Sequence, residues 1–254
     1  FEAIRQLVFP AIPLPDSDRI VVLQNWDAAA NQPEFRATRD FVVWRDALES
    51  VDDLAAYRMV TRNLMITEGL AEAVFTAEIT AAGFRVLSVP PLLGRTLLDA
   101  DERAGAPLVA VIGYDLWQTR FQGDSGVIGR RVHITGVPAT IVGVMPRGFA
   151  FPRTQELWAP LRIDIAGSGP RQGMPIRIFG RLAPDATLDQ ARAELTNLGR
   201  IAARDLPWTH ELLRPQVFTF AQSVQAFGES ESLTLLTGNV FVVMLLALVC
   251  ANVG

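Results

Sequence analysis

The C-terminal stretch of the chain constrains its architecture more than any other feature. Residues 232–254 read SLTLLTGNVFVVMLLALVCANVG without a charged side chain, and Val240–Ala251 is apolar throughout. An α-helix needs about 20 apolar residues to cross a hydrocarbon core of about 30 Å. We therefore expect a transmembrane helix over 232–254, and a buried helix of a globular core is the less favoured alternative.

The apolar side chains expected to characterise this helix are Val240, Phe241, Leu245, Leu246, Leu248 and Cys250. Cys250 is the 1 cysteine of the chain, so no disulfide forms within it. No basic residue lies between Arg214 and the apolar segment, which is typical of a flank outside the cytoplasm. The chain starts at Phe1 and its apolar pattern still runs at Gly254, so we expect a piece of a longer protein.

The remaining sequence, residues 1–231, is long enough for one large domain or two small ones. A net charge of −4 gives no general basic surface, so we expect no nucleic-acid partner. All 23 basic residues are arginine, which excludes a Schiff-base lysine and the lysine of a P-loop. A Walker motif is absent from the sequence, so ATP hydrolysis would have to come from another polypeptide.

Hydrophobic periodicity predicts a mixture of helices and strands. Helices are expected at Thr38–Tyr57, Ala81–Ser88, Gly113–Phe121 and Leu188–Leu206, the last capped by Thr187 or Asp185. Strands are expected at Arg19–Gln24, Leu108–Ile112, Ile176–Leu182 and Gln216–Phe220, with another extended piece from Leu157. Hairpins are expected at Arg58–Thr67 with Ala71–Thr80, and at Arg131–Thr135 with Thr140–Val144 around a turn at 136–138. Because a regular βαβ rhythm is missing, these elements predict an α+β fold, with a flexible linker at Ile165–Pro175.

Catalytic and metal-binding patterns are weak. The chain has 2 histidines, His133 and His210, which lie far apart in sequence without the HExxH spacing of zinc enzymes. A GxSxG motif is absent, and we expect the carboxylate pairs Asp52-Asp53 and Asp101-Glu102 to face solvent. We therefore predict no catalytic residue, no cofactor and no metal ligand, and a membrane-anchored enzyme is the least favoured class.

A group of aromatic residues has two interpretations. Trp117, Phe121, Phe149, Phe151 and Trp158 are expected to form the core of a small domain. Alternatively, Phe149 and Phe151, with Trp117 and Phe121, stay exposed as a surface for a partner, because the two phenylalanines alternate with Ala150. The second interpretation requires exposed rings.

Several motifs occur together and in order along the chain. They are LSVPPLLGRTL (Leu87–Leu97), the stretch from VAVIGYDLWQTRF to MPRGFAFP (Val109–Pro152), LWAPL (Leu157–Leu161), GRLAPDATLDQARAEL (Gly180–Leu195) and LLALVCANV (Leu245–Val253). This set resembles the extracytoplasmic core domain of MacB-like ABC transporter permeases, and among them the stand-alone permeases common in acidobacteria. The resemblance covers nearly the whole chain.

The resemblance implies a two-lobed extracytoplasmic domain followed by the start of a transmembrane helix. Residues 1–89 and 169–231 would form a porter-like α/β lobe, residues 90–168 an inserted β-rich lobe, and 232–254 the truncated helix. The location implied is the periplasmic side of the bacterial inner membrane.

The resemblance also implies function and partners. The domain would couple ATP-driven motion of the membrane helices to export or mechanotransmission in the envelope, without catalysis of its own. A separate ABC ATPase subunit, a second permease copy in a homodimer, and an envelope adaptor or lipoprotein are the implied partners. The alternative is an interaction module that binds an adaptor, a lipoprotein or a cell-wall enzyme.

Overall fold

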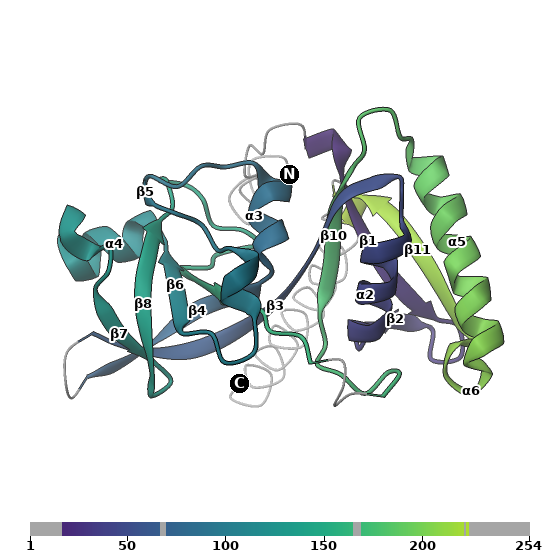
Figure 1. The fold of residues 1–254 in the computed structure, drawn as a ribbon, viewed down its shortest axis with the longest axis horizontal. Helices are drawn as coiled ribbons and strands as arrows, with labels where there is room; N and C mark the ends of the chain where they lie inside the picture. Colours follow the sequence, from purple (N-terminus) through teal and green to yellow (C-terminus); the bar gives the residue numbers. More distant parts are fainter. Residues whose placement is uncertain (1–16, 67–69, 165–168, 221, 224–254) are drawn as a thin grey trace, which may run out of the picture.

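A computed structural model describes residues 17–66, 70–164, 169–220, 222 and 223 (Figure 1). The strands are β1 (Ile20–Asp27), β2 (Gln32–Glu34), β3 (Val51–Met65), β4 (Ala71–Ile79), β5 (Leu93–Gly94), β6 (Leu108–Ile112), β7 (Arg131–Ile134), β8 (Val137–Val144), β9 (Leu157–Pro160), β10 (Arg177–Leu182) and β11 (Leu213–Thr219). The helices are α2 (Thr38–Ala47), α3 (Ala81–Leu87), α4 (Tyr114–Phe121), α5 (Leu188–Asp205) and α6 (Pro207–His210), with short 3-10 helices η1 (Ser17–Arg19), η2 (Asp99–Glu102) and η3 (Ser125–Val127).

These strands form one mixed sheet. Its main path within the described residues runs β11-β1-β10-β3-β4-β9-β6-β8-β5, while β2 pairs with β1, and β7 pairs with β3 and β8. The pairs β4–β9 and β6–β8 are parallel, whereas neighbours such as β1–β10 and β3–β4 are antiparallel. Such a mixture of hairpins, crossovers and helices is the α+β class predicted from the sequence.

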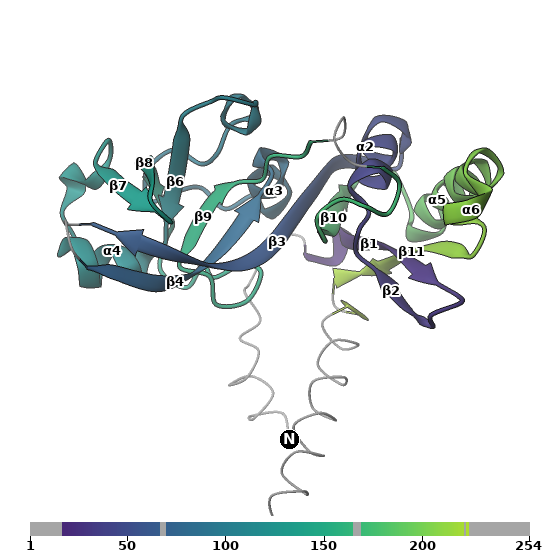
Figure 2. The same cartoon turned by 90° about the horizontal axis from the view of Figure 1, so that it is seen from below.

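One end of the sheet, here called the helix-covered end, consists of β11, β1, β10 and the first half of β3. Figure 2 shows α2 and α5 together on one side of these strands. Helix α5 is amphipathic, and its Ala191 and Leu195 are buried against the sheet. Thr187 caps the helix, since its Oγ1 accepts from the Gln190 amide at 3.2 Å and the Gln190 Oε1 accepts from the Thr187 amide at 2.7 Å.

Strand β3 connects the two ends of the sheet. Its residues Val51–Tyr57 pair with β10, its residues Tyr57–Met65 pair with β4, and Leu64 and Met65 also reach β7. At about 3.3 Å per residue, a strand of 15 residues is about 50 Å long. The two ends therefore share one continuous backbone hydrogen-bond network.

The other end, the small-strand end, contains β5 to β9 and helix α4 (Figure 1). Its core includes Ile112, Ile141 and Leu157 from the strands and Leu116 from α4. A further core lies beneath α3 and contains side chains from both ends of the sheet, among them Phe179 from β10. Packing thus joins the two ends in addition to β3.

One predicted helix is wrong over half its length. The helix predicted at Thr38–Tyr57 ends at Ala47, and its second half is the start of β3. Leu48, Val51 and Leu54 do recur at helical spacing, and all three are buried. Val51 and Leu54 reach the same core as Leu48 from an extended strand, because pairing of β3 with its neighbours outweighs the local periodicity.

The other helices and strands predicted within the described residues are confirmed, most of them with shifted boundaries. The second hairpin turns at Thr135 and Gly136, whose φ values of 50° and 80° suit a two-residue turn, so β8 begins at Val137 and not at Thr140. The final strand begins at Leu213, three residues before the predicted start at Gln216.

The first and last described strands are neighbours. β1 and β11 pair antiparallel from Val21 opposite Thr219 to Asp27 opposite Leu213. The chain therefore enters β1 and leaves β11 at the same end of this pair. The predicted membrane segment 232–254, including Val240 to Cys250, lies outside the described residues. Within the ranges that the structure describes, each helix is too short or too polar to cross a bilayer.

Candidate functional site

The four aromatic residues considered for a partner surface lie in the interior. The exposed fractions of Phe149, Phe151, Trp117 and Phe121 are 6%, 0%, 9% and 3%. Trp117 and Phe121 belong to the core of the small-strand end. Phe149 and Phe151 belong to the core beneath α3. The exposure that the partner-surface interpretation required is absent, so these rings are core residues in the described structure.

Phe151 connects several elements. Its ring centroid lies 5.4 Å from that of Tyr57 on β3, 5.0 Å from that of Phe179 on β10 and 6.2 Å from that of Phe220. The indole N–H of Trp158 donates to the carbonyl oxygen of Phe151 at 2.8 Å. Burial raises the pKa of Tyr57 to about 12, so its hydroxyl stays neutral in this core.

The largest exposed apolar side chains are elsewhere. Trp208 on α6 is 78% exposed, and Leu212, four residues later, is 48% exposed. Phe75 on β4 is 58% exposed and Met59 on β3 is 37% exposed. Sequence reasoning missed this set, because Trp208 follows a helix stop and carries no periodic signal that marks exposure.

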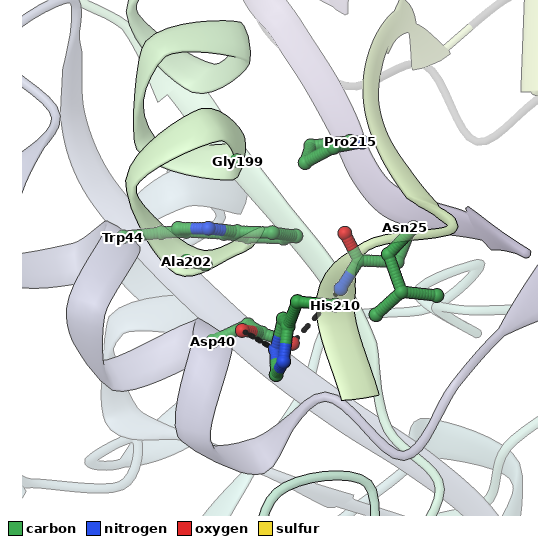
Figure 3. A pocket seen from close by; sticks show the side chains of 8 residues that line it. Asn25, Asp40, Trp44, Gly199, Ala202, His210 and Pro215 are labelled. Atoms are coloured by element: carbon green, nitrogen blue, oxygen red, sulfur yellow. Dashed lines mark hydrogen bonds and ion pairs between the residues drawn. The ribbon is translucent and has the colours of Figure 1, made fainter. Parts of the chain in front are cut away.

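A buried polar group links α6, α2 and β1 (Figure 3). The Nε2 of His210 lies 3.0 Å from Oδ1 of Asp40, and the Nδ2 of Asn25 donates to Oδ2 of the same carboxylate at 2.8 Å. The other ring nitrogen of His210, Nδ1, lies 2.7 Å from Oγ1 of Thr209. His210, Asp40 and Asn25 are at most 8% exposed. The carboxylate is thus satisfied from two sides inside the protein.

A small cavity of about 10 Å³ adjoins this group. Its lining consists of Asn25, Asp40, Trp44, Gly199, Ala202, His210, Leu213 and Pro215. Figure 3 shows the Asn25 carbonyl oxygen directed away from Asp40. A space of this size with polar walls holds about one water molecule.

The order hydroxyl, imidazole and carboxylate has the pattern of a catalytic triad. A cavity of about 10 Å³ leaves no room for an organic substrate beside His210. His133 lies on β7, away from this group in the sheet order, opposite Met65 and Pro138. In the described part of the chain, no group of three or more acidic, histidine or cysteine side chains is arranged to hold a metal. The geometry of this hydrogen-bonded group therefore favours a structural role over catalysis.

Arg171 binds two carboxylates and a backbone carbonyl next to the His210 group, and we call this set of contacts the arginine clamp. The Arg171 Nη2 donates to Oδ2 of Asp27 at 2.5 Å and to Oε2 of Glu34 at 2.8 Å. Its Nη1 donates to the carbonyl oxygen of Thr209 at 3.4 Å. Arg171 belongs to the segment returning from β9 to β10, so it ties that segment to β1, β2 and α6.

The arginine clamp lowers the pKa values of the carboxyl groups of Glu34 and Asp27. Burial raises the pKa of Glu34, but hydrogen bonds from Arg36 and Arg171 lower it more, to about 2. Hydrogen bonds from the Ala30 amide and from Arg171 lower the pKa of Asp27. Both carboxylates therefore stay ionised beside Arg171 at neutral pH.

The described part of the predicted linker, residues 169–175, contacts the domain at particular residues, and Ile176 directly after it is buried. A Cβ added at Gly173 would lie 2.1 Å from Oγ1 of Thr38, so only glycine fits at this close approach. Ile176 is 2% exposed, and its amide donates to the carbonyl oxygen of Phe35 at 2.8 Å. These contacts and the ion pairs of Arg171 hold part of residues 169–175 against the domain, while residues 165–168 lie outside the described ranges.

The two carboxylate pairs are only partly solvent-facing. Asp52 is exposed as predicted, and Asp53 forms an ion pair with Arg85 at 3.0 Å. Asp101 is 9% exposed and pairs with Arg95 at 2.7 Å, which contradicts the expectation. Glu102 accepts a hydrogen bond from the Ala81 amide at the start of α3, and burial raises its pKa.

Comparisons with solved structures identify the same fold. A permease-protein domain from Porphyromonas gingivalis aligns with a TM-score of 0.59 at 14% identity, covering 82% of this chain and 92% of that domain. The extracellular domain of the noncanonic ABC-type transporter YknZ from Gram-positive bacteria gives 0.56 at 17% identity, covering 78% and 99%. The periplasmic region of MacB from Actinobacillus actinomycetemcomitans gives 0.59 at 13% identity, covering 84% and 94%.

Sequence comparison gives the family. No curated protein matches the chain significantly. The MacB-like periplasmic core domain family matches residues 3–198, which is most of the chain. The chain therefore belongs to the MacB-like periplasmic core domain family and is the periplasmic or extracellular domain of an ABC-type permease.

Proposed function

We propose that this domain couples ATP-driven motion of membrane helices to export or mechanotransmission in the cell envelope. In this proposal, a separate ABC ATPase subunit supplies the energy. Two copies of the permease form a homodimer in the bacterial inner membrane, with this domain on the periplasmic side. An envelope adaptor or lipoprotein is a further partner, and the domain itself performs no catalysis.

The observation that carries this proposal is the pairing of β1 with β11. The first and last described strands share seven residue pairs, so the chain enters and leaves through neighbouring strands. A displacement of the chain where it enters β1 or where it leaves β11 therefore acts directly on the sheet. Because β3 and the core beneath α3 join both ends of that sheet, the displacement moves the domain as one body.

We also propose the two-lobe organisation for this chain. The porter-like lobe comprises residues 1–89 and 169–231, the inserted β-rich lobe comprises 90–168, and the start of a transmembrane helix comprises 232–254. The helix-covered end supports the first assignment, since α2 and α5 both pack on one side of β1, β10 and β11 (Figure 2). Leu64 of β3 and Val74 of β4 lie within residues 1–89 but pack in the core of the small-strand end, so the tips of these two strands reach into the inserted lobe.

Distance measurements between spin labels test the proposal. In a full-length permease whose Cys250 is changed to Ala, cysteine replaces Val137 alone, or Val137 and Ile201 together; these side chains are 52% and 41% exposed. ATP binding by the partner subunit should change the distance between the Val137→Cys labels of two copies. The distance between labels at 137 and 201 within one copy should stay constant. Unchanged distances between copies in every nucleotide state would contradict the proposed coupling.

The alternative function is an envelope interaction module. The exposed pair Trp208 and Leu212 favours it, because large aromatic side chains held on the surface are typical of binding hot spots. A photoreactive amino acid at Trp208 should then crosslink to one envelope protein, whereas the same probe at the exposed Val137 should not. Equal crosslinking at both positions would remove the support for this alternative.

A further inference from the structure

Helix α6 is a short element held by side chains from its surroundings. It spans only Pro207–His210, and its Trp208 is 78% exposed. A helix of one turn has almost no stability of its own. Its position therefore depends on the contacts of His210 with α2 and of Thr209 with the end of α5.

When His210 is neutral, its hydrogen-bond partners determine which ring nitrogen carries the hydrogen. An ionised carboxylate only accepts hydrogen bonds, so the His210 Nε2, at 3.0 Å from Asp40, carries the hydrogen. The Nδ1 then has a free lone pair. It accepts from the Thr209 hydroxyl, whose Oγ1 lies 2.7 Å away.

The same atoms also accommodate the protonated ring. A hydrogen on the His210 Nδ1 donates to Oγ1 of Thr209, and the hydroxyl hydrogen then turns to the carbonyl oxygen of Leu206, 3.3 Å from Oγ1. Leu206 is the residue that follows the last turn of α5. Protonation therefore costs no hydrogen bond. It turns the bond to Asp40 into an ion pair, reverses the bond between Nδ1 and the Thr209 hydroxyl, and directs that hydroxyl to the end of α5.

The charged groups around His210 belong to few elements. Asp40 from α2 is the carboxylate that contacts the ring. From the segment before β10, Arg171 reaches the Thr209 carbonyl, and its charge is balanced by Asp27 of β1 and Glu34 of β2. Within the described residues, the parts of α5 and β11 that line the adjoining cavity are uncharged: Gly199, Ala202, Leu213 and Pro215.

On α6 and next to it, two further charges are directed elsewhere. Glu211 is exposed at the end of the helix. Arg214 of β11 donates to the backbone carbonyl oxygens of Glu211 and Leu213. The cavity of about 10 Å³ beside His210 has room for about one water molecule.

We propose that Asp40, His210 and Thr209 form a proton-responsive clasp that sets how α6 is held against α2 and the end of α5. Imidazole is the side chain that ordinarily changes charge between about pH 5 and 8. The clasp exchanges one fully bonded arrangement for another across that range. The position of the exposed Trp208 follows the state of the clasp. This proposal does not depend on whether the domain moves during transport.

Nuclear magnetic resonance of the full chain in mild detergent tests the clasp. Histidine labelled with nitrogen-15 gives one ring from His210 and an internal reference from His133, because the chain has 2 histidines. Spectra are recorded from about pH 5 to pH 8, the range in which imidazole ordinarily changes charge, and the His210 ring should carry its hydrogen on Nε2 at the high-pH end. The indole signal of Trp208 and the amide signals of Thr209 and Glu211 should move with the same midpoint.

Variants separate the clasp from a merely structural contact. Asp40→Asn should lower the proton affinity of His210 by about tenfold or more, because an opposite charge within about 4–6 Å favours the charged form. Thr209→Val removes the acceptor for Nδ1–H and should also lower the affinity, whereas Thr209→Ser keeps it. The threonine pair preserves the test if Asp40→Asn fails to fold.

Three results would overturn the proposal. In the first, His210 stays in one protonation state across this range while His133 titrates. In the second, His210 titrates but the signals of Thr209, Trp208 and Glu211 do not follow its midpoint. In the third, folded Thr209→Val titrates with the same midpoint as Thr209→Ser.

Discussion

Replacement of Phe151 by alanine should destabilise the whole domain. The side chain is fully buried, and its ring lies 5.4 Å from that of Tyr57 and 5.0 Å from that of Phe179. These partners belong to β3 and β10, so the cavity would open where the two ends of the sheet meet. The Phe151→Ala variant thus tests both the core assignment of this ring and the continuity of the domain.

The magnitude follows from the contacts. Loss of a buried phenylalanine side chain costs about 3–5 kcal/mol, and each aromatic pair adds about 0.5–1.5 kcal/mol to what area alone gives. Because Phe151 makes close ring contacts on two strands, we expect a loss in the upper part of that range. In a domain of this size, about 2–4 °C of melting temperature corresponds to 1 kcal/mol, so a loss of about 4–5 kcal/mol should lower the melting temperature by about 8–20 °C.

Urea and thermal unfolding of the full chain in mild detergent, followed by tryptophan fluorescence, measure this loss. Phe75→Ala is the matched control, because it makes the same chemical change at a site that is 58% exposed. We expect the control to change the free energy of unfolding by less than about 1 kcal/mol. If Phe151→Ala cost no more than Phe75→Ala, the ring would not be a core residue and the partner-surface interpretation would regain its basis.

Three further predictions concern the clamp, a helix cap and a close approach. The folded pKa of Glu34, about 2, lies below its ordinary value of 4.5, so its ionised form contributes stability above pH 4.5 that is lost as the pH falls through 2. Urea midpoints measured from about pH 6 to pH 2 should therefore fall less steeply in Glu34→Gln than in the wild type; parallel curves would contradict this. Thr187→Ala should cost about 1 kcal/mol by removing the cap of α5, whereas Thr187→Ser should be nearly neutral, as thermal unfolding would measure. Gly173→Ala should destabilise by about 1–3 kcal/mol because its Cβ would lie 2.1 Å from Oγ1 of Thr38, and adding Thr38→Ala should recover part of the loss; additive costs in the double variant would refute the clash.

Local sequence patterns predicted the helices and strands whose signals lie within one short segment of the chain. The helix at Leu188–Asp205 combines apolar residues at helical spacing with a cap at Thr187, and both features act within a few residues. The strand at Leu108–Ile112 was predicted with its observed limits, because a short apolar run without polar interruption is typical of a buried strand.

Tertiary contacts decided what local patterns could not. The segment Val51–Tyr57 satisfies a helical repeat, but it becomes a strand because β10 and β4 pair with β3 along its length. The linker at 169–175 looks flexible in composition, yet Arg171 and Gly173 fix it through partners far away in sequence. Sequence spacing carries no information about such partners.

The candidate site was harder to predict for the same reason. His210 and Asp40 are separated by 170 residues, so neither position suggests the other. The expectation that the aromatic rings form a core was available from the sequence, but the choice between core and surface needed their burial. Trp208 was missed because exposure of a single side chain leaves no periodic pattern.

The central claim is that this domain belongs to a permease driven by a separate ATPase. Co-purification of the full-length protein from membranes in mild detergent, with mass spectrometry of its companions, tests it most directly. We predict recovery of a Walker-motif ATPase in equal stoichiometry with the permease. Recovery of the permease alone, or with an envelope enzyme and no ATPase, would contradict the claim.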